Sequence, residues 1–418
     1  MYVAKNTFEI MRPFVVVTRI FGLCPVTYEQ KGAYFIMKRS IKYILYSYIL
    51  AIVLVSTVLM GVINDLKVDE KESVRMKSMK TRYITCCDIS VVIMLVVFGI
   101  VSTPFKQKTF WKMLKCFNNL DNWLPITTQE VQKYKRTSRN FILVLMIGFS
   151  VIVAFDVSVW DRLSRINNNS DKFWKNYTTF YMLYYIVLMQ EIFFCHVVYF
   201  SKIRLTHLNK ALASEARIRD SVNSSGSRTT VATLDLAKEL NTTYLGKGGH
   251  STHKLVDMSN YDKMATFGQV YERIVEVVEY VNEVGGLGII IILLSCLLHL
   301  IVTPYFLLYE IANNGNKVFI CLQTVWLITH STRLLLVVEP CHQFLIENSK
   351  TINLVLQLLA FVRDEEARKT LHLLALQVSQ CKIRFYSCGL VKIDRSLITA
   401  VVGAVTTYLV ILFQFNKV

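Results

Sequence analysis

The chain has 418 residues, of which 53% are hydrophobic and 18% are charged, and it carries a formal net charge of +17. This apolar fraction is too high for an ordinary soluble protein of that length, so the composition indicates a membrane protein. The positive charge does not indicate a nucleic-acid partner, because the lysines and arginines fall between apolar segments and form no single basic face. The ten cysteines show no paired spacing with histidines, so we predict neither a metal site nor a cofactor.

Seven apolar segments are each long enough to cross a bilayer, which takes about 20 helical residues. They are Ile41–Ile63, Tyr83–Val101, Phe141–Trp160, Phe173–Phe200, Leu287–Ile311, Val318–Val338 and Leu397–Phe415. The sequence therefore predicts an all-α membrane protein with seven transmembrane helices.

Basic residues beside the spans predict the orientation, because Lys and Arg collect on the cytoplasmic side. Residues 1–40 and the second loop are strongly basic, which places the N-terminus inside and, after seven spans, the C-terminus outside. The first loop is basic too and contradicts this assignment. Sequons at Asn168 and Asn176 fall in or beside the third loop, where a luminal position would permit glycosylation.

The regions between the spans indicate how the chain is divided. We predict a cytoplasmic N-terminal segment (1–40), four transmembrane helices (41–200), a cytoplasmic loop (201–286) with a disordered linker at about 221–252, transmembrane helices five and six (287–338), cytoplasmic anchor helices (339–389) and a last transmembrane helix (390–418). The linker is rich in Ser, Thr, Gly and Asn, whereas helical spacing of apolar residues flanks it on both sides. Cys388-Gly389 is predicted to break the last helix between its cytoplasmic and membrane halves.

Polar residues inside membrane spans are costly and are therefore candidates for function. Several lie at a similar depth on five helices, which predicts an outward-facing cleft: Asp88, Asp156, Tyr181, Tyr184, Thr303, Tyr305, Gln323 and Trp326, with Trp160 nearer the rim. Gln323 and Trp326 place an amide beside an indole on one helix face, as polyol binding requires. The alternatives are an aromatic belt for the tyrosines and tryptophans, and pairing of the two aspartates with a buried cation. His299, His330 and Arg333 lie deeper, where buried hydrogen bonding is expected.

The last span contains Thr407-Tyr408, five apolar residues and then Gln414-Phe415. A lone apolar helix is most often an anchor, but this order resembles the C-terminal signature of insect gustatory receptors. The stretch from His330 to His342, HSTRLLLVVEPCH, is also similar to that family. The resemblance implies a ligand-gated cation channel, a tetramer in which the last helix of each subunit lines one pore. Phe415 would then form a hydrophobic gate and Gln414 a polar ring, and helical spacing adds Ile411 to the pore lining.

The pairs Thr303 with Tyr305 and Gln323 with Trp326, together with Trp160, resemble the sugar pocket of the fructose-receptor branch of that family. The resemblance implies that the two tryptophans flank the sugar ring while Thr303, Tyr305 and Gln323 bind its hydroxyl groups. Asp88, Asp156 and Tyr184 would complete the cleft. The implied function is a D-fructose-gated non-selective channel for Na, K and Ca in the plasma membrane of sensory neurons, as a homotetramer or a heterotetramer with other gustatory receptors.

Other functions remain as alternatives. A bitter-type or broadly tuned gustatory receptor would have the same architecture. Asp161-Arg162 faintly resembles a motif of G-protein-coupled receptors, but the predicted orientation places it outside the cell. Pro304 alone hints at a transporter, and the absence of a Ser-His-Asp grouping or paired catalytic carboxylates argues against an enzyme.

Overall fold

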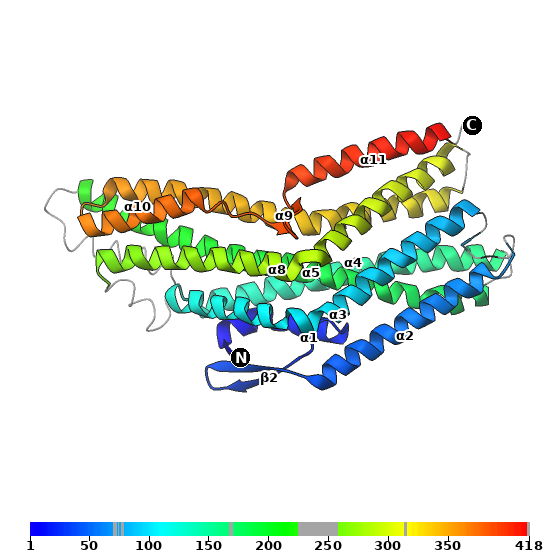
Figure 1. Ribbon diagram of the computed structural model, residues 1–418, viewed down its shortest axis with the longest axis horizontal. Coiled ribbons are helices and arrows are strands. Elements are labelled where there is room, and N and C mark those ends of the chain that lie inside the picture. The colour runs from blue at the N-terminus through cyan, green and yellow to red at the C-terminus, as the bar shows by residue number, and fades with distance from the viewer. Residues whose placement is uncertain are drawn as a thin grey trace.

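The computed structural model describes residues 1–69, 73, 75–76, 79–166, 170–224, 258–312 and 316–415. They form an elongated bundle of long helices with a small sheet at its side (Figure 1). The helices are α1 (Lys5–Ile20), α2 (Ile41–Leu66), α3 (Met79–Trp123), α4 (Thr128–Ile166), α5 (Ser170–Ser224), α8 (Asn260–Ala312), α9 (Lys317–Phe361), α10 (Glu365–Gln380) and α11 (Arg395–Phe415). The strands are β1 (Tyr2–Ala4), β2 (Val26–Lys31), β3 (Tyr34–Arg39), β4 (Tyr386–Ser387) and β5 (Val391–Lys392).

Seven helices among the described residues are long and apolar enough to cross a membrane. They are α2, α3, α4, α5, α8, α9 and α11, and each contains one of the predicted apolar segments. The prediction of an all-α protein with seven transmembrane helices is therefore confirmed. The orientation of the termini stays a prediction.

Four of these helices extend far beyond the length that a bilayer requires. Helices α3, α5, α8 and α9 contain 45, 55, 53 and 45 residues, whereas about 20 suffice to span the hydrocarbon core. Their extensions gather at one end of the bundle, where α10 packs against α8 and α9 (Figure 1). This arrangement agrees with the helices expected on both sides of the linker, most of which lies outside the described residues. The role of these extensions as an anchor stays a prediction.

Helix α8 is bent at Gly286, within the glycine-rich stretch expected to join its two halves. The backbone of Gly286 has φ 27° and ψ −128°, a conformation that residues with a Cβ rarely adopt. The Ser387 hydroxyl donates a hydrogen bond of 2.5 Å to the Gly286 carbonyl oxygen. Asn282 also binds the backbone of Arg384 and Tyr386, so the segment before α11 is fastened to the bend.

The chain leaves helical conformation at Cys388-Gly389, where the break before the last transmembrane helix was predicted, but the break has another form. Residues 386–392 form a hairpin in which β4 pairs with β5, and Cys388 and Gly389 make its turn with φ values of 51° and 68°. The break is therefore a separate hairpin and not an interruption within one helix, and α11 begins only at Arg395. The positive φ at both residues explains the break, because a helix cannot continue through such a turn.

The first forty residues fold into a compact element and not into a plain extension. Strand β3 lies between β1 and β2 with antiparallel pairing, and Val3 faces Phe35 across the ladder. Phe8 of α1 stacks on Phe35 with ring centroids 4.2 Å apart. The side chain of Asn118 in α3 bonds the backbone of Tyr2 and Ala4, which attaches this element to the bundle.

Helix α5 lies at the centre of the bundle and α11 at its periphery. Of the most apolar window of α5, 78% is buried by the rest of the chain, whereas the figure for α11 is 0%. Helix α11 stands beside α8 and α9 along the edge of the bundle (Figure 1). Its apolar surface is therefore left for lipid or for other subunits.

The contact between α2 and α5 is close enough to involve the backbone of both helices. A methyl group added at Gly61 would lie 2.1 Å from the carbonyl oxygen of Asn176. Asn176 is only 7% exposed at this contact, and such burial disfavours a glycan on the folded protein. The other predicted glycosylation site, Asn168, lies outside the described residues.

We expect Gly61→Ala to lower the thermal stability of the purified receptor, because α2 and α5 must move apart. Overpacking of this kind costs about 1–3 kcal/mol. Gly148→Ala in α4 is the matched control, since nothing lies within 4 Å of the added methyl group. Melting followed by size-exclusion chromatography should show a lower midpoint for Gly61→Ala and an unchanged or higher one for Gly148→Ala. Equal midpoints would contradict the close packing.

Candidate ligand-binding site

A cavity of about 330 Å³ lies among α3, α4, α5, α8 and α9, the five helices predicted to form a cleft. The residues predicted at the site that line it are Asp88, Asp156, Trp160, Tyr181, Tyr184, Thr303, Gln323 and Trp326. Tyr305 is not among the lining residues, and its ring instead lies against Phe306 and Tyr309. The physical reason is helical geometry, because residues two positions apart, such as Thr303 and Tyr305, face opposite sides of a helix.

Asp156 of α4 is the most heavily bonded acid of the cavity. It accepts hydrogen bonds from the Tyr181 hydroxyl and, at 2.8 Å, from the Trp326 indole Nε1. The guanidinium of Arg75 lies 3.4 Å away and completes an ion pair in which both side chains are largely buried. Asp156 therefore joins α4, α5, α9 and the segment before α3. The alternative that this aspartate pairs with a buried cation agrees with the structure.

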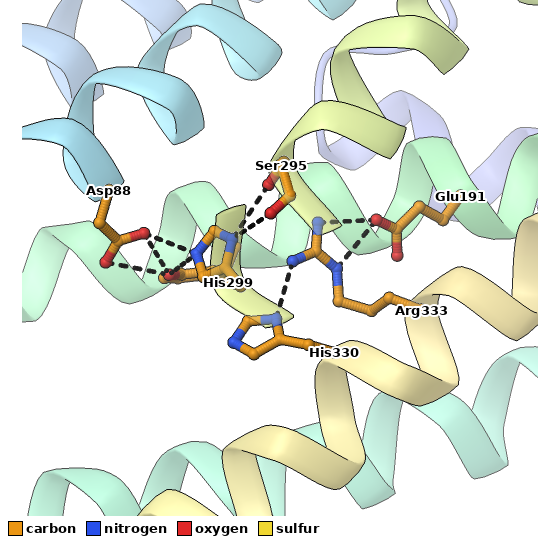
Figure 2. A network of polar contacts seen from close by, with 7 residues as sticks. Asp88, Glu191, Ser295, His299, His330 and Arg333 are labelled. Atoms are coloured by element: carbon orange, nitrogen blue, oxygen red, sulfur yellow. Dashed lines mark hydrogen bonds and ion pairs between the residues drawn. The ribbon is translucent and has the colours of Figure 1, made fainter. Parts of the chain in front are cut away.

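Asp88 of α3 meets His299 of α8 on the other side of the cavity. Its Oδ1 lies 2.6 Å from His299 Nε2, and the Tyr184 hydroxyl donates to the same oxygen at 3.2 Å. His299 Nδ1 lies 2.5 Å from the Ser295 carbonyl oxygen, which can only accept, so Nδ1 carries a proton (Figure 2). The Asp88 carboxyl group and the His299 imidazole therefore bind each other, and the pair carries little net charge. Within the described residues no group of three or more His, Cys, Asp or Glu side chains is placed to hold a metal.

Beneath the cavity, Arg333 of α9 forms an ion pair with Glu191 of α5. Arg333 Nε donates to Glu191 Oε1 at 2.9 Å, and neither side chain is more than 5% exposed. The same guanidinium lies 3.3 Å from His330 Nδ1 (Figure 2). His330 and Arg333 thus form buried hydrogen bonds, as expected, and the acid that pairs with Arg333 is Glu191.

The rings of both tryptophans already contact protein groups. The Arg75 guanidinium lies 4.6 Å from the centroid of Trp160. The Trp326 ring stacks on His330 at 5.4 Å and is tilted against Tyr184 at 5.5 Å. A ligand between the tryptophans would therefore contact their remaining surfaces, and the indole Nε1 of Trp326 is not free to bind it.

Gln323 and Thr303 carry polar groups that the described residues of the protein leave unbonded. Across the part of the chain that the structure describes, neither side chain has a hydrogen bond to another protein group. Gln323 can donate and accept, and Thr303 carries a hydroxyl group. These two groups are polar contacts that the cavity offers to a ligand without breaking a bond within the protein.

The sequence did not identify Arg75 as a residue of the cavity. From the sequence, Arg75 was only one of the basic residues of the first loop, which contradict the predicted orientation. In the structure Arg75 is turned inward, packs against Trp160 and Tyr177, and bonds Asp156. Two features of the sequence could have indicated this contact. The first loop has an excess of basic residues, and Asp156 in the third span is an acid without an evident partner in the sequence.

The three residues predicted to line a pore lie in the last turns of α11. Ile411 and Gln414 are exposed on the single chain, and the side chain of Phe415 lies outside the described part. The cavity lies elsewhere, among the other helices. The predicted ligand and pore residues thus occupy separate regions.

A bundle of seven apolar helices around a polar, internally neutralised cavity defines a multi-pass membrane receptor for a small molecule. The family model described as 7tm Chemosensory receptor matches residues 11–418. The chain therefore belongs to the 7tm chemosensory receptor family, whose members include the insect gustatory receptors that it resembles in sequence.

The similar proteins include two from Drosophila melanogaster. Over 98% of its length the chain is 26% identical to "Gustatory receptor for sugar taste 43a" and spans 99% of that protein. It is 22% identical to "Putative gustatory receptor 28b" over 99% of this chain and 87% of the relative.

Two solved structures of the insect olfactory receptor OR5 from Machilis hrabei have a similar fold. The first has a TM-score of 0.64 at 12% identity and covers 97% of this chain and 98% of that one. The second, in complex with eugenol, has a TM-score of 0.59 at 14% identity with the same coverage. The chain thus has the fold of this insect olfactory receptor, and its family is one of chemosensory receptors and not of enzymes.

The ion pair of Arg75 and Asp156 should be measurable in a double-mutant cycle. We expect Arg75→Met and Asp156→Asn each to lower the unfolding temperature, because each leaves a buried partner unpaired. The double variant should lose less than the sum, with a coupling of about 0.5–3 kcal/mol. Lys67→Met, an exposed cation of the same loop, is the control and should not couple to Asp156→Asn. Additive losses for Arg75 and Asp156 would show that the contact does not stabilise the fold.

Proposed function

We propose that the chain is a gustatory receptor that acts as a sugar-gated, non-selective cation channel, with D-fructose as its ligand. The observation that carries this proposal is the cavity, in which a free amide (Gln323) and a free hydroxyl (Thr303) lie beside two indoles. Its volume of about 330 Å³ is at the lower end of the range for ligand sites, which suits a small ligand. Similarity over nearly the whole chain to a receptor named for sugar taste supports the same ligand class.

The charge state of the cavity favours a neutral ligand. Asp156 is paired with Arg75, and Asp88 is paired with His299. A charged ligand would have to compete with these bonds or remain without a counterion in a site of low dielectric constant. A sugar needs only hydroxyl hydrogen bonds and apolar ring contacts, which Gln323, Thr303 and the tryptophan rings supply.

The pore is proposed to form where α11 meets copies of itself. Its most apolar window is 0% buried within one chain, and Ile411 is 39% exposed. In a tetramer Phe415 would close the pore by excluding water, and opening would bring Gln414 to the pore surface. Such channels in the plasma membrane of sensory neurons would pass Na, K and Ca, and the subunits would assemble alone or with other gustatory receptors.

The ligand cavity is connected to α11 through α8 and α9. Helix α9 carries Gln323 and Trp326 in the cavity, and farther along it Glu339 bonds Arg395 at the start of α11, at 2.9 Å. A movement of α9 on ligand binding would therefore reach the base of the pore helix. Sugar can shift the gating equilibrium only by as much as its affinity differs between the closed and open states.

We expect D-fructose to evoke a cation current in cells that express this chain alone, and Gln323→Ala to weaken that response. One lost hydrogen bond corresponds to a loss of about tenfold or less in apparent affinity. Trp326→Ala should weaken it further, because the variant removes an aromatic wall and leaves Asp156 without one donor. Concentration–response curves with surface labelling measure these effects.

Thr324→Ala is the matched control, since Thr324 is exposed on α9 beside Gln323 and does not line the cavity. A normal response of both cavity variants would show that the ligand binds elsewhere. A current evoked by bitter compounds but by no monosaccharide would favour a bitter-type or broadly tuned receptor and would leave the channel class intact.

Phe415→Ala should increase the current without ligand, because a smaller side chain lets water enter the proposed constriction. The control is Val410→Ala, an exposed apolar position of α11 outside the Ile411–Phe415 face. Basal conductance in the absence of sugar is the measurement. An unchanged baseline in Phe415→Ala with normal surface expression would contradict its role as the gate.

A further inference from the structure

A second cavity lies apart from the ligand cavity and shares no lining residue with it. It has a volume of about 130 Å³ and lies among α1, α3, α5 and α8, beside the bend of α8. Its wall is largely aromatic and aliphatic and includes Phe14, Phe98, Phe110, Phe193 and Ile289. Apolar cavities of about 150 Å³ in protein interiors hold molecules of the size of benzene. This cavity is therefore large enough for an apolar ligand or for part of a longer chain.

Most polar groups in its wall are bonded to the protein. The Thr103 hydroxyl donates to the Gly99 carbonyl oxygen at 2.7 Å, and the Gln190 amide donates to that of Leu95 at 3.2 Å. The Thr18 hydroxyl donates to the Phe14 carbonyl oxygen at 2.9 Å. These groups have no need of a ligand.

Among the described residues, Gln107 and Lys106 are two donors in the wall that lack such bonds. Gln107 is only 7% exposed, and its Nε2 is buried with no hydrogen-bond partner among the described residues. The adjacent Lys106 ammonium lies 4.8 Å from the Phe98 ring, and within the described part of the chain no carboxylate pairs with it. A buried amide donor and a lysine beside an aromatic wall are complementary to an anionic group attached to an apolar body.

The position of these donors fits an amphiphile held at a membrane boundary. Lys106 follows the predicted end of the second span, Val101, and begins the basic second loop. Its charge would lie at the level of lipid head groups while the aromatic wall continues into the bundle. We propose that this cavity binds the hydrocarbon chain of an anionic amphiphile, whose carboxylate or phosphate oxygen accepts hydrogen bonds from Lys106 and Gln107.

Occupancy of this site would act on the bend of α8. Gly285 and Gly288 line the cavity on either side of Gly286, whose carbonyl oxygen accepts the hydrogen bond from Ser387 of the hairpin before α11. A hydrocarbon chain packed against these glycines would favour one geometry of the bend. An effect on current rests on the proposed channel function, whereas binding itself does not.

The test is photo-crosslinking of the full-length receptor in nanodiscs of neutral phosphatidylcholine. One arm contains a fatty acid with a diazirine in its chain, a second contains phosphatidylserine with the same label, and a third contains the corresponding uncharged fatty alcohol. Mass spectrometry of the labelled peptides locates the site. We expect labelling of residues 98–113 and 281–292 by at least one anionic probe, and the first two arms distinguish a free acid from a lipid.

Three variants separate the contribution of the head group from that of the cavity. Lys106→Gln and Gln107→Leu should each reduce the apparent affinity for the anionic probe by about tenfold, the size of one charge-assisted hydrogen bond, and leave the alcohol unaffected. Gly288→Leu should abolish labelling by every probe. A Cβ at Gly288 would lie at ordinary contact distances, 3.4 Å from Phe98 and 3.8 Å from Lys106, and the remaining atoms of the leucine are meant to fill the cavity.

Lys108→Gln is the matched control, because Lys108 is exposed and does not line the cavity. If Lys106→Gln and Lys108→Gln lowered the apparent affinity for the anionic probe equally, the effect would be one of general surface charge. That result would overturn the proposal. Labelling confined to other surfaces in both anionic arms would overturn it as well. If Gly288→Leu fails to fold, the comparison of Lys106→Gln with Lys108→Gln still decides. A receptor that binds the amphiphile but gives no sugar current would refute the proposed function and leave this site in place.

Discussion

The ion pair between Glu191 and Arg333 is the interaction on which the interior of the bundle depends. It joins the central helix α5 to α9 where neither side chain reaches solvent. A charge in such a position must be paired, because loss of one partner would leave the other uncompensated in a medium of low dielectric constant. Arg333 also contacts His330, which stacks on Trp326, so the floor of the ligand cavity is built on this pair. A continuous series of contacts therefore joins the Glu191–Arg333 pair to Trp326 and, through its indole, to Asp156.

The selectivity of the cavity follows from which of its groups are already bonded. Its two aspartates have protein partners, and these contacts hold α3, α4, α5, α8, α9 and the segment before α3 together. Within the described residues the side chains of Gln323 and Thr303 form no hydrogen bond between helices, so they remain available to a ligand. Under the proposed function, the bonded residues affect stability as well as ligand binding, whereas the unbonded residues change ligand preference at little structural cost. Tuning within such a receptor would accordingly vary first at positions like Gln323.

The sequence predicted the spans and most of the cavity because both follow from local rules. Hydrophobic length identifies a transmembrane helix, and polar residues at a common depth on five helices converge when those helices pack. Tyr305 was assigned to the cleft by its depth and by the resemblance, and neither accounts for the helical angle that separates it from Thr303. Arg75 and the hairpin form of the break at Cys388-Gly389 were missed because they depend on tertiary contacts. Arg75 bonds an acid 81 positions away, and the hairpin is fastened to the bend of α8 across 101 positions.

Helix α11 is attached to the rest of the chain in a way that suits a moving element. Its apolar surface packs little against its own chain. Among the described residues, its ion pair with another helix lies at its first residue, where Arg395 binds Glu339 of α9. The hairpin just before it is bonded to Gly286. These two attachments lie on α9 and α8, and both helices also line the ligand cavity. A change of shape in the cavity that alters the spacing of α8 and α9 must therefore change the spacing of the two attachments at the base of α11. An isolated anchor in lipid would need neither attachment, so their presence favours a helix whose position depends on the cavity.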